Sequence, residues 1–284
     1  MKKLLITGSN GQLGRALQKL CPPDIQIIPT DFKELDITDK EACVNKVLEE
    51  KPSHIINAAA YTNVEQAEDD KDLALKINKD GAYNLAYAAN KANCGFVHIS
   101  TDFVFNGETN KPYIPSDKPA PLSVYGYTKF LGEQAIINEL GNKALIIRTA
   151  WLYSKDGKNF VNTILNLLKA RSLLKIINNQ HGTPTSADSL AKAIFVSIEK
   201  SVTGIHHFTD GGEATWYEFA CEIQRMALKH GLIREERQIL PIMDTDFPTK
   251  AKRPHYGVLD KTSFIEATDI VLEPWQDVLD RTFA

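Results

Sequence analysis

Three side chains in the first half of this chain have types and spacing suited to proton transfer. Tyr125 and Lys129 stand four residues apart on a predicted helix, so their side chains share one face. A free phenol has a pKa of about 10 and keeps its proton at neutral pH. A neighbouring ammonium favours the phenolate, which we expect to lower the pKa of Tyr125 and make it a better proton donor. Thr101 ends a predicted buried strand and can hold a carbonyl oxygen beside that phenol, so the trio predicts chemistry on a carbonyl or an alcohol.

A glycine-rich segment at the start of the chain predicts a nucleotide site. Gly8, Gly11 and Gly14 follow the apolar run at 4–7 directly, as in a strand, a tight turn and a helix. Gly8 can take a positive φ, Gly11 lets the backbone approach a pyrophosphate, and Gly14 lets the helix pack on the strand. The amides at the start of that helix would face the phosphates. This segment and the proton-transfer trio together predict NADH or NADPH as the cofactor.

Asp31 ends the next predicted strand, where a carboxylate would meet the adenine ribose. Asp31 would favour NADH by repelling a 2′-phosphate, whereas Lys33 could attract one, so the preference stays open. Asp36 and Ile37 could reach the adenine, and the small residues at 57–60 leave room beside a cofactor, although close packing alone would also select them.

The elements that must position these residues alternate between strand and helix as far as residue 148. We expect strands at 3–7, 25–30, 54–57, 96–100 and 144–148, and helices at 12–20, 39–50, 71–92 and 125–140. This alternation predicts an α/β fold with a doubly wound parallel Rossmann sheet.

After residue 151 the alternation loosens into a smaller lobe. Helices are expected at 160–170, 187–199 and 215–230, and the second is expected to begin with a capping box between Thr185 and Asp188. We therefore expect a dinucleotide-binding domain at 1–152 and a mainly substrate-binding lobe at 153–284, with a soft boundary and shared elements.

Composition narrows the class of protein. The 284 residues carry a net charge of −3, which gives no reason to expect a nucleic acid or an anionic membrane as partner. No stretch approaches the roughly 20 apolar residues of a membrane span. The four cysteines are scattered and are expected to be reduced thiols, so we expect a cytoplasmic protein.

Six strings in both lobes resemble the extended short-chain dehydrogenase/reductases, and among these the dTDP-4-dehydrorhamnose reductases. The strings lie at 57–68, 100–105, 125–133, 148–153, 179–185 and 253–254. The resemblance spans nearly the whole chain. It implies reduction of the 4-keto group of dTDP-4-dehydro-L-rhamnose by NADPH or NADH, with Tyr125 as the proton donor and a small-molecule dTDP-sugar as the partner.

The resemblance also implies roles for particular residues. The implied catalytic residues are Thr101, Tyr125 and Lys129. The implied cofactor-binding residues are Gly8, Gly11, Gln12, Leu13, Gly14, Asp31, Asp36, Ile37, Ala60, Tyr61, Thr62, Tyr125 and Lys129. The implied substrate-binding residues are Thr101, Asp102, Trp151 and Arg253. Arg253 belongs to a basic cluster with Lys250 and Lys252, and its guanidinium suits a diphosphate.

Two positions depart from this family's pattern. Ala16 stands where some members carry a magnesium-binding glutamate at a dimer interface, so we expect no metal ligand there and a homodimer stays open. Gly257 stands where the family has a serine after an Arg-Pro pair. His98 and His181 lie on a strand and in a loop, and we assign a role to neither.

The sequence leaves open two alternatives to a dTDP-4-dehydrorhamnose reductase. One is another nucleotide-sugar enzyme of the same superfamily, such as an epimerase, which would not consume added NADPH. A dehydratase is disfavoured because Phe103, not a second carboxylate, follows Asp102. The other alternative is a regulatory subunit that binds NADP without catalysis, against which the intact Thr101, Tyr125 and Lys129 argue.

Overall fold

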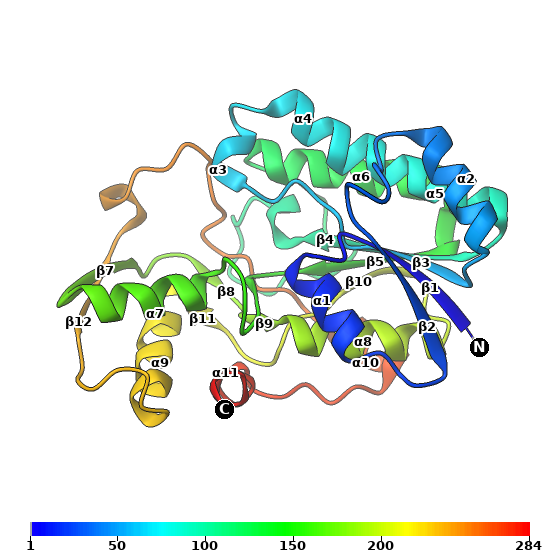
Figure 1. Ribbon diagram of the computed structural model, residues 1–284. Coiled ribbons are helices and arrows are strands. Elements are labelled where there is room, and N and C mark those ends of the chain that lie inside the picture. Colours follow the sequence, from blue (N-terminus) through cyan, green and yellow to red (C-terminus); the bar gives the residue numbers. More distant parts are fainter. Residues whose placement is uncertain (1) are drawn as a thin grey trace.

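A six-stranded parallel sheet forms the centre of the molecule (Figure 1). The computed structural model describes residues 2–284. The strands are β1 (Lys2–Thr7), β2 (Ile25–Thr30), β3 (His54–Asn57), β4 (Gly95–Thr101), β5 (Ala144–Thr149) and β10 (Gly204–His207). Their order is β10-β5-β4-β3-β1-β2, and every neighbouring pair is parallel. This confirms the predicted doubly wound sheet.

Helices cover both faces of the sheet. Above it in Figure 1 lie α2 (Lys40–Glu50), α5 (Ala82–Ala92) and α6 (Val124–Leu140), and below it lie α1 (Gln12–Lys19), α8 (Ala187–Glu199) and α10 (Thr262–Thr268). Successive strand residues point to opposite faces, so Leu4 and Leu5 enter different buried clusters. Strands buried on both faces read as continuous apolar runs, which is why the sequence revealed them.

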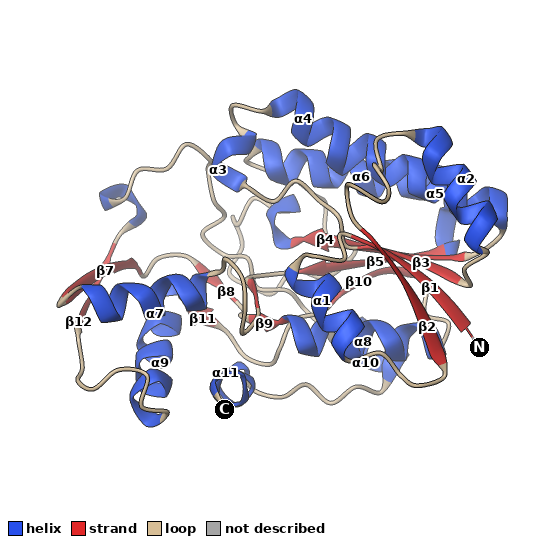
Figure 2. Cartoon of the chain, viewed as in Figure 1, coloured by secondary structure: helices blue, strands red, loops and turns tan. Residues whose placement is uncertain are grey.

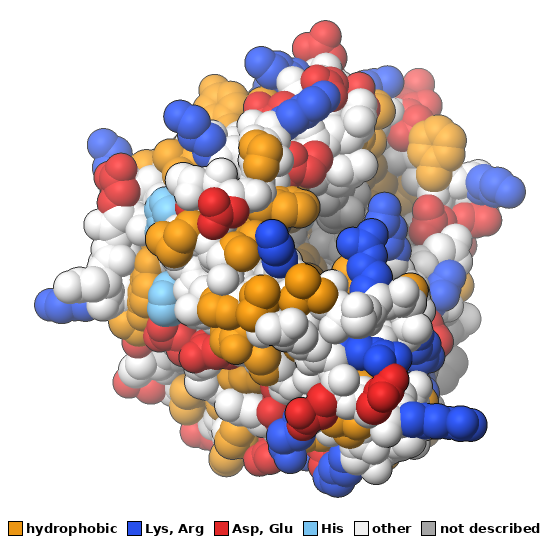
Figure 3. All heavy atoms as spheres, turned by 90° about the vertical axis from the view of Figure 1, so that its left-hand side faces the viewer, with side chains coloured by type: hydrophobic (Ala, Val, Ile, Leu, Met, Phe, Trp, Pro, Cys, Tyr) orange, Lys and Arg blue, Asp and Glu red, His pale blue; other side chains and the backbone are white. Residues whose placement is uncertain are grey.

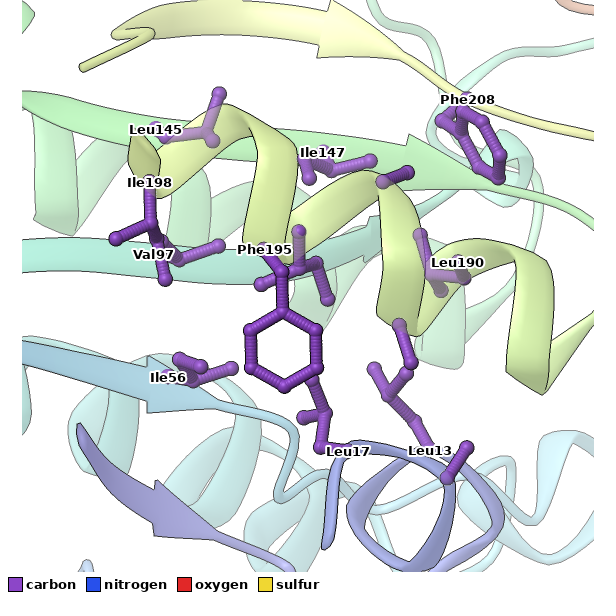
Figure 4. Close-up of a cluster of buried hydrophobic side chains, with 14 of the residues drawn as sticks. Leu13, Leu17, Ile56, Val97, Leu145, Ile147, Leu190, Phe195, Ile198 and Phe208 are labelled. Carbon is purple, nitrogen blue, oxygen red and sulfur yellow. The ribbon is translucent and has the colours of Figure 1, made fainter. Parts of the chain in front are cut away.

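The cluster below the sheet joins the two halves of the chain (Figure 4). Leu13 and Leu17 of α1 and Ile56 of β3 pack there with Leu190 and Phe195 of α8. Strand β10 pairs with β5, and α8 packs on α1, although both come after residue 152. The sequence did not predict β10, because its Gly-Ile-His-His stretch has no apolar run.

The remaining elements form a smaller lobe, on the left of Figure 2. It contains α7 (Phe160–Ala170), α9 (Trp216–Lys229), α11 (Trp275–Phe283) and the parallel pair β7 (Leu173–Ile177) and β12 (Gln238–Ile242). Two short pairs adjoin it, β6 (Leu152–Tyr153) with β9 (Thr185–Ser186) and β8 (His181–Gly182) with β11 (Ala214–Thr215). Phe219 of α9 and Trp275 of α11 belong to a separate buried cluster in this lobe.

Two helix starts differ from the sequence prediction. The predicted capping box at Thr185 is wrong, because Thr185 lies in β9, and Ser186 caps α8 by accepting from the amide of Asp188 at 3.2 Å. A capping box does form at α9: Thr215 accepts from the Glu218 amide at 3.1 Å, and the Glu218 carboxylate accepts from the Thr215 amide at 2.7 Å.

The predicted helix at 71–92 is interrupted. It consists of α4 (Lys71–Leu75), a π-helical turn at Lys76–Gly81, and α5, and the short helix α3 (Val64–Ala67) precedes it. A π-helical turn inside an α-helix often marks a functional site. Single 3₁₀ turns occupy Asp102–Val104, Gly141–Lys143 and Asp244–Asp246.

The surface on the left-hand side of Figure 1 mixes hydrophobic, basic and acidic side chains and is hollowed near a group of basic ones (Figure 3). Within residues 2–284, no helix has the length and apolar character that crossing a membrane requires. All four cysteines are free thiols.

Candidate active site

The strand order reverses between β1 and β3, and the loops that leave their carboxyl ends diverge there. A cavity of about 740 Å³ opens at this point. Of the predicted cofactor-binding residues, those lining it are Gly8, Gly11, Gln12, Leu13, Gly14, Asp31, Asp36, Ile37, Ala60 and Thr62. A dinucleotide placed here would lie across the switch point of the sheet.

The glycine segment has the backbone that the sequence predicted. Gly8 has φ +68°, and a Cβ atom there would lie 2.8 Å from the backbone of Ala59. A Cβ atom on Gly14 would collide with the carbonyl oxygen of Gly8, so the first turn of α1 rests directly on the loop. At Gly11, a Cβ atom would meet only the Gly8 oxygen, at 3.2 Å. The amides at the start of α1 therefore stay open toward the cavity.

The Asp31 carboxylate is held at the edge of this cavity by two backbone amides. Its Oδ2 accepts from the amide of Asn10 at 3.0 Å, and its Oδ1 accepts from the amide of Phe32 at 2.8 Å. The lone pairs that these bonds leave free can accept from a hydroxyl in the cavity.

Tyr61, like Tyr125 and Lys129, is a predicted cofactor contact that is not among the residues lining this cavity. Its hydroxyl donates to Asp70 at 2.8 Å, and its amide donates to Asn78 Oδ1 at 2.8 Å. Asp70 thus holds the phenol of Tyr61, and the contact of Tyr61 with the cofactor stays a prediction.

The sequence did not suggest several of the lining residues, and one of them, Lys158, comes from a distant segment. They include Asn10, Phe32, Leu73, Lys76, Ile77 and Lys158. Lys158 follows β6, and its loop is fastened over the glycine segment by Gln12, whose Oε1 accepts from Ser154 at 2.9 Å and from Asn159 at 2.8 Å. No local pattern reveals a loop that crosses from the other lobe.

Tyr125 is brought to the end of β4 by the start of α6. Ser123 caps this helix by accepting from the amide of Gly126 at 3.2 Å. Any side chain on Gly126 would collide with the carbonyl oxygen of Phe103, so only glycine allows this approach. The Phe103 ring then meets the Tyr125 ring edge-on, with centroids 5.6 Å apart. The phenol faces Thr101 and Asp102 as a result.

The pKa of Tyr125 shifts in the direction opposite to our expectation. Burial raises the pKa of Tyr125 to about 12, the hydrogen bond with Thr101 lowers it in part, and the charge of Asp102 raises it further. The expected lowering by Lys129 was wrong, because burial of the phenol is the largest cause of the shift and Lys129 is not among the causes. Such a phenol still carries its proton at neutral pH and can give it to an alkoxide, which is a stronger base.

Lys129 is buried and its ammonium group has two polar neighbours. Its Nζ donates to the carbonyl oxygen of Ile99 at 2.6 Å and lies 3.2 Å from Nε2 of His98. Burial lowers the pKa of Lys129 to about 8, and the charge of Glu133 offsets part of this. No hydrogen bond joins Lys129 to Tyr125 directly.

A buried ion pair fixes the helix beneath these residues. The Glu133 carboxylate accepts from Arg148 at 2.9 Å and 2.7 Å, and it also accepts from the Ser100 hydroxyl at 2.5 Å. Removing one partner of such a pair would leave a buried charge, so α6, β4 and β5 are held in one register.

Asn78 in the π-helical turn is a further support that the sequence did not suggest. Its Nδ2 donates to Thr128 Oγ1 at 3.0 Å and to the Tyr61 carbonyl oxygen at 3.1 Å. Any side chain on Gly132 would collide with the Asn78 carbonyl oxygen. The interrupted helix and α6 therefore approach closely beside Lys129.

The predicted substrate residues Asp102, Trp151 and Arg253 line one small crevice, of about 10 Å³. The other lining residues are Phe103, Gln180, His181, Trp216 and Pro254. Trp151 has φ +46° and stacks on Trp216 with centroids 3.5 Å apart. This crevice is nearly closed, in contrast to the cavity at the switch point.

Burial affects two polar groups in the crevice. Arg253 donates from Nη2 to Glu65 at 2.8 Å, but its buried Nε has no partner. Burial raises the pKa of Asp102 to about 7, with the hydrogen bond from Thr101 opposing it. A Cβ atom on Gly257 would lie 2.8 Å from Asp102 Oδ2, so glycine at this position leaves room for the carboxyl group.

The two lysines near Arg253 do not enter the crevice. Lys250 forms an ion pair with Asp69 at 2.5 Å, and Lys252 is exposed. Of the basic cluster, only Arg253 faces a site.

Comparisons with known proteins agree with this geometry. The model of the family described as the RmlD substrate binding domain matches residues 1–284. A dTDP-4-dehydrorhamnose reductase of Aggregatibacter actinomycetemcomitans is 39% identical, over 98% of this chain and 97% of that protein. A dTDP-4-dehydrorhamnose reductase structure from Clostridium acetobutylicum has a TM-score of 0.93 and 42% identity, covering 99% of this chain and 98% of that one. The structure of the Bacillus anthracis enzyme of that name, in complex with NADP, also has a TM-score of 0.93, with 38% identity, and covers 100% of this chain and 99% of that one.

Proposed function

The chain belongs to the RmlD substrate binding domain family, and from that membership we propose that it is an NAD(P)H-dependent dTDP-4-dehydrorhamnose reductase. The reaction reduces the 4-keto group of dTDP-4-dehydro-L-rhamnose and gives dTDP-L-rhamnose. The observation that carries this proposal is the meeting of Tyr125 and Thr101 at the end of β4, beside a dinucleotide-sized cavity.

The residues at the switch point fit a nicotinamide dinucleotide. Gly8 and Gly14 bring the start of α1 against the loop, which leaves its amides free for a pyrophosphate. Asp31 would accept from the adenine ribose, and Lys158 would add a positive charge near the phosphates. When bound, the nicotinamide supplies a hydride to the ketone carbon.

The chain's own residues bind and protonate the oxygen of that ketone. Tyr125 holds a proton that burial makes hard to lose to water, and gives it to the oxygen as negative charge develops there. Thr101 donates to Asp102 at 3.0 Å and lies on the same side as the phenol, so its hydroxyl can turn to hold the oxygen. Lys129 would bind the nicotinamide ribose and keep the phenol's surroundings polar.

Arg253 and the tryptophan pair are the proposed contacts with the nucleotide-sugar. The buried Nε of Arg253 lacks a partner, and a diphosphate oxygen would satisfy it. Trp151 and Trp216 stack on each other in the same crevice and offer flat apolar surfaces to a sugar or a base. Substrate entry must open this crevice, because its present volume of about 10 Å³ holds no sugar.

The setting of the enzyme is part of the proposal. We expect a cytoplasmic protein, since its four cysteines are free thiols and its proposed substrate and cofactor are soluble metabolites. A homodimer stays a prediction that sedimentation equilibrium can check.

An assay with the full chain and purified dTDP-4-dehydro-L-rhamnose tests the function. We expect NADPH or NADH to be oxidised in a one-to-one ratio with the dTDP-L-rhamnose formed. An isomer of the 4-keto substrate, formed without net oxidation of cofactor, would indicate an epimerase instead. Cofactor binding without turnover on any 4-keto nucleotide-sugar would favour a regulatory subunit.

A further inference from the structure

A line of buried polar side chains runs beneath the cofactor cavity and ends at Lys129. It passes from Thr7 on β1 through Asn57 on β3 to His98 on β4, and all four side chains are at most 2% exposed. Buried polar groups must satisfy one another, so the donors and acceptors in such a line can be assigned one by one.

The orientation of the Asn57 amide is fixed at one end. Its Oδ1 accepts from the backbone amide of Ala59 at 3.2 Å and from the Thr7 hydroxyl at 2.8 Å. A backbone N–H can only donate, so the oxygen must face Ala59. The Asn57 Nδ2 group therefore points at His98, 3.1 Å from its Nδ1.

This orientation fixes the tautomer of His98. Because Asn57 donates, Nδ1 of His98 must accept and carries no proton. The burial of His98 and the charge of Lys129 lower the pKa of His98 well below its usual value, so the ring is neutral. Its single proton then sits on Nε2, which lies 3.2 Å from Nζ of Lys129.

An N–H group facing an ammonium group finds no lone pair, whereas an uncharged amine offers one. We propose that His98 is a positioning residue that donates from Nε2 to Lys129 and favours its uncharged amine, so that Lys129 changes protonation near neutral pH in the cofactor-free protein. The Ile99 carbonyl oxygen accepts a hydrogen from Lys129 in either state and keeps Nζ in place.

The other charged groups around Lys129 do not remove this effect. Glu133, one turn along α6, favours the ammonium, but Arg148 of β5 already holds its carboxylate in a two-point ion pair. Tyr125 is uncharged, and Asp102 at the end of β4 has a raised pKa. The lowered pKa of Lys129, about 8, agrees with a lysine that titrates within reach of neutrality.

The tautomer can be measured without any substitution. In the wild-type protein labelled with ¹⁵N-histidine, the ring nitrogen shifts report which nitrogen carries the proton. We expect His98 to be neutral at pH 7 with its proton on Nε2. A proton on Nδ1, or a charged ring, would overturn the proposal.

The effect on Lys129 can be measured from its ¹³Cε shift in protein labelled with ¹³C-lysine, with the resonance assigned by its loss in Lys129→Met. We expect a midpoint below about 9 in the wild type, compared with about 10.4 for a free lysine. His98→Gln offers an amide oxygen that can accept from the ammonium, and we expect it to raise the midpoint by at least about one pH unit, a tenfold change in the protonation constant.

His206→Gln is the matched control, since His206 lies on β10, is bonded to Ser263 and Thr203, and does not contact Lys129. It should leave the Lys129 midpoint unchanged. An unchanged midpoint in a folded His98→Gln, or an ordinary lysine midpoint in the wild type, would show that His98 is only structural. If His98→Gln fails to fold, the His98 tautomer and the Lys129 midpoint of the wild type still test the proposal.

Discussion

The proposed cofactor side and the proposed substrate side of this protein are built differently. The cavity at the switch point is open, about 740 Å³, and apart from Lys158 its lining comes from the first 77 residues. The crevice around Arg253 is about 10 Å³, and its lining comes from segments between residues 102 and 254. The first region is ready to receive a ligand, whereas the second must rearrange to receive one.

The physical cause of this difference lies in what holds each region. Strand ends and close-packed glycines hold the backbone of the cofactor side in place. Stacked tryptophans and the Arg253–Glu65 pair hold the substrate side closed, at 3.5 Å between ring centroids and 2.8 Å between charged atoms. A ligand can replace contacts of this kind, since each is worth about 0.5–1.5 kcal/mol.

The largest expected effect comes from the residue where the two regions meet. Tyr125→Phe removes the proton donor and keeps the ring, so we expect turnover to fall by about 10²–10⁴-fold while the cofactor dissociation constant is unchanged. Steady-state assays and fluorescence titration with NADPH measure the two effects. Tyr127→Phe is the control, because Tyr127 lies on the same helix with half of its surface exposed. Near-normal turnover in Tyr125→Phe would remove it from this role.

A change confined to the substrate side should leave the cofactor side untouched. Arg253→Ala removes the proposed charged contact to the diphosphate, and we expect the KM for the nucleotide-sugar to rise about 10–100-fold. The dissociation constant for NADPH should stay the same. Lys252→Ala is the matched control, since that side chain is a neighbouring exposed cation. An equal rise in KM for both variants would mean that only the overall charge matters.

Asp102, on the substrate side, makes the stability of the protein depend on pH. Its folded pKa of about 7 lies above the ordinary 3.8, so the folded protein binds this proton more tightly than the unfolded chain does. The stabilisation from this proton is lost as pH rises through 7. Between pH 8 and pH 5, we expect the free energy of unfolding of the wild type to rise by about 2 kcal/mol relative to Asp102→Asn. Urea unfolding at several pH values measures this difference, and parallel curves for the two proteins would contradict it.

A smaller effect is expected on the cofactor side. Asp31→Ala should weaken NADH binding by about tenfold and NADPH binding less, because the carboxylate both accepts from the ribose and repels a 2′-phosphate. Lys33→Ala, in the same loop, should weaken NADPH more than NADH. Isothermal titration with both cofactors provides the comparison. Equal losses for both cofactors in Asp31→Ala would mean that Asp31 does not contact the ribose.

The sequence predicted most of the cofactor side because its signals are local. Gly8, Gly11 and Gly14 lie close together in the sequence, and Asp31 follows the next apolar run. The sequence could not show that Asp70 holds the Tyr61 hydroxyl, because nothing in the segment around Tyr61 indicates this contact. The sequence could not show that Lys158 or β10 would join this half, because both arrive through contacts between distant segments.

On the substrate side, the predicted residues came from the resemblance to a family more than from local sequence patterns. Asp102, Trp151 and Arg253 do line one crevice, but Trp216 has no sequence signal that would place it there. The sequence could not predict the direction in which the pKa of Tyr125 shifts either. This direction depends on how deeply the phenol is buried, and burial is a property of the folded chain.

The proposed function requires, above all, that a hydride is transferred to the ketone carbon at this site. The decisive measurement incubates the full chain with dTDP-4-dehydro-L-rhamnose and NADPH that carries deuterium at nicotinamide carbon 4, with each face labelled separately. We expect one of the two labels to appear at carbon 4 of the sugar in the product, as seen by mass spectrometry and NMR. Product that contains no deuterium from either label would contradict the account.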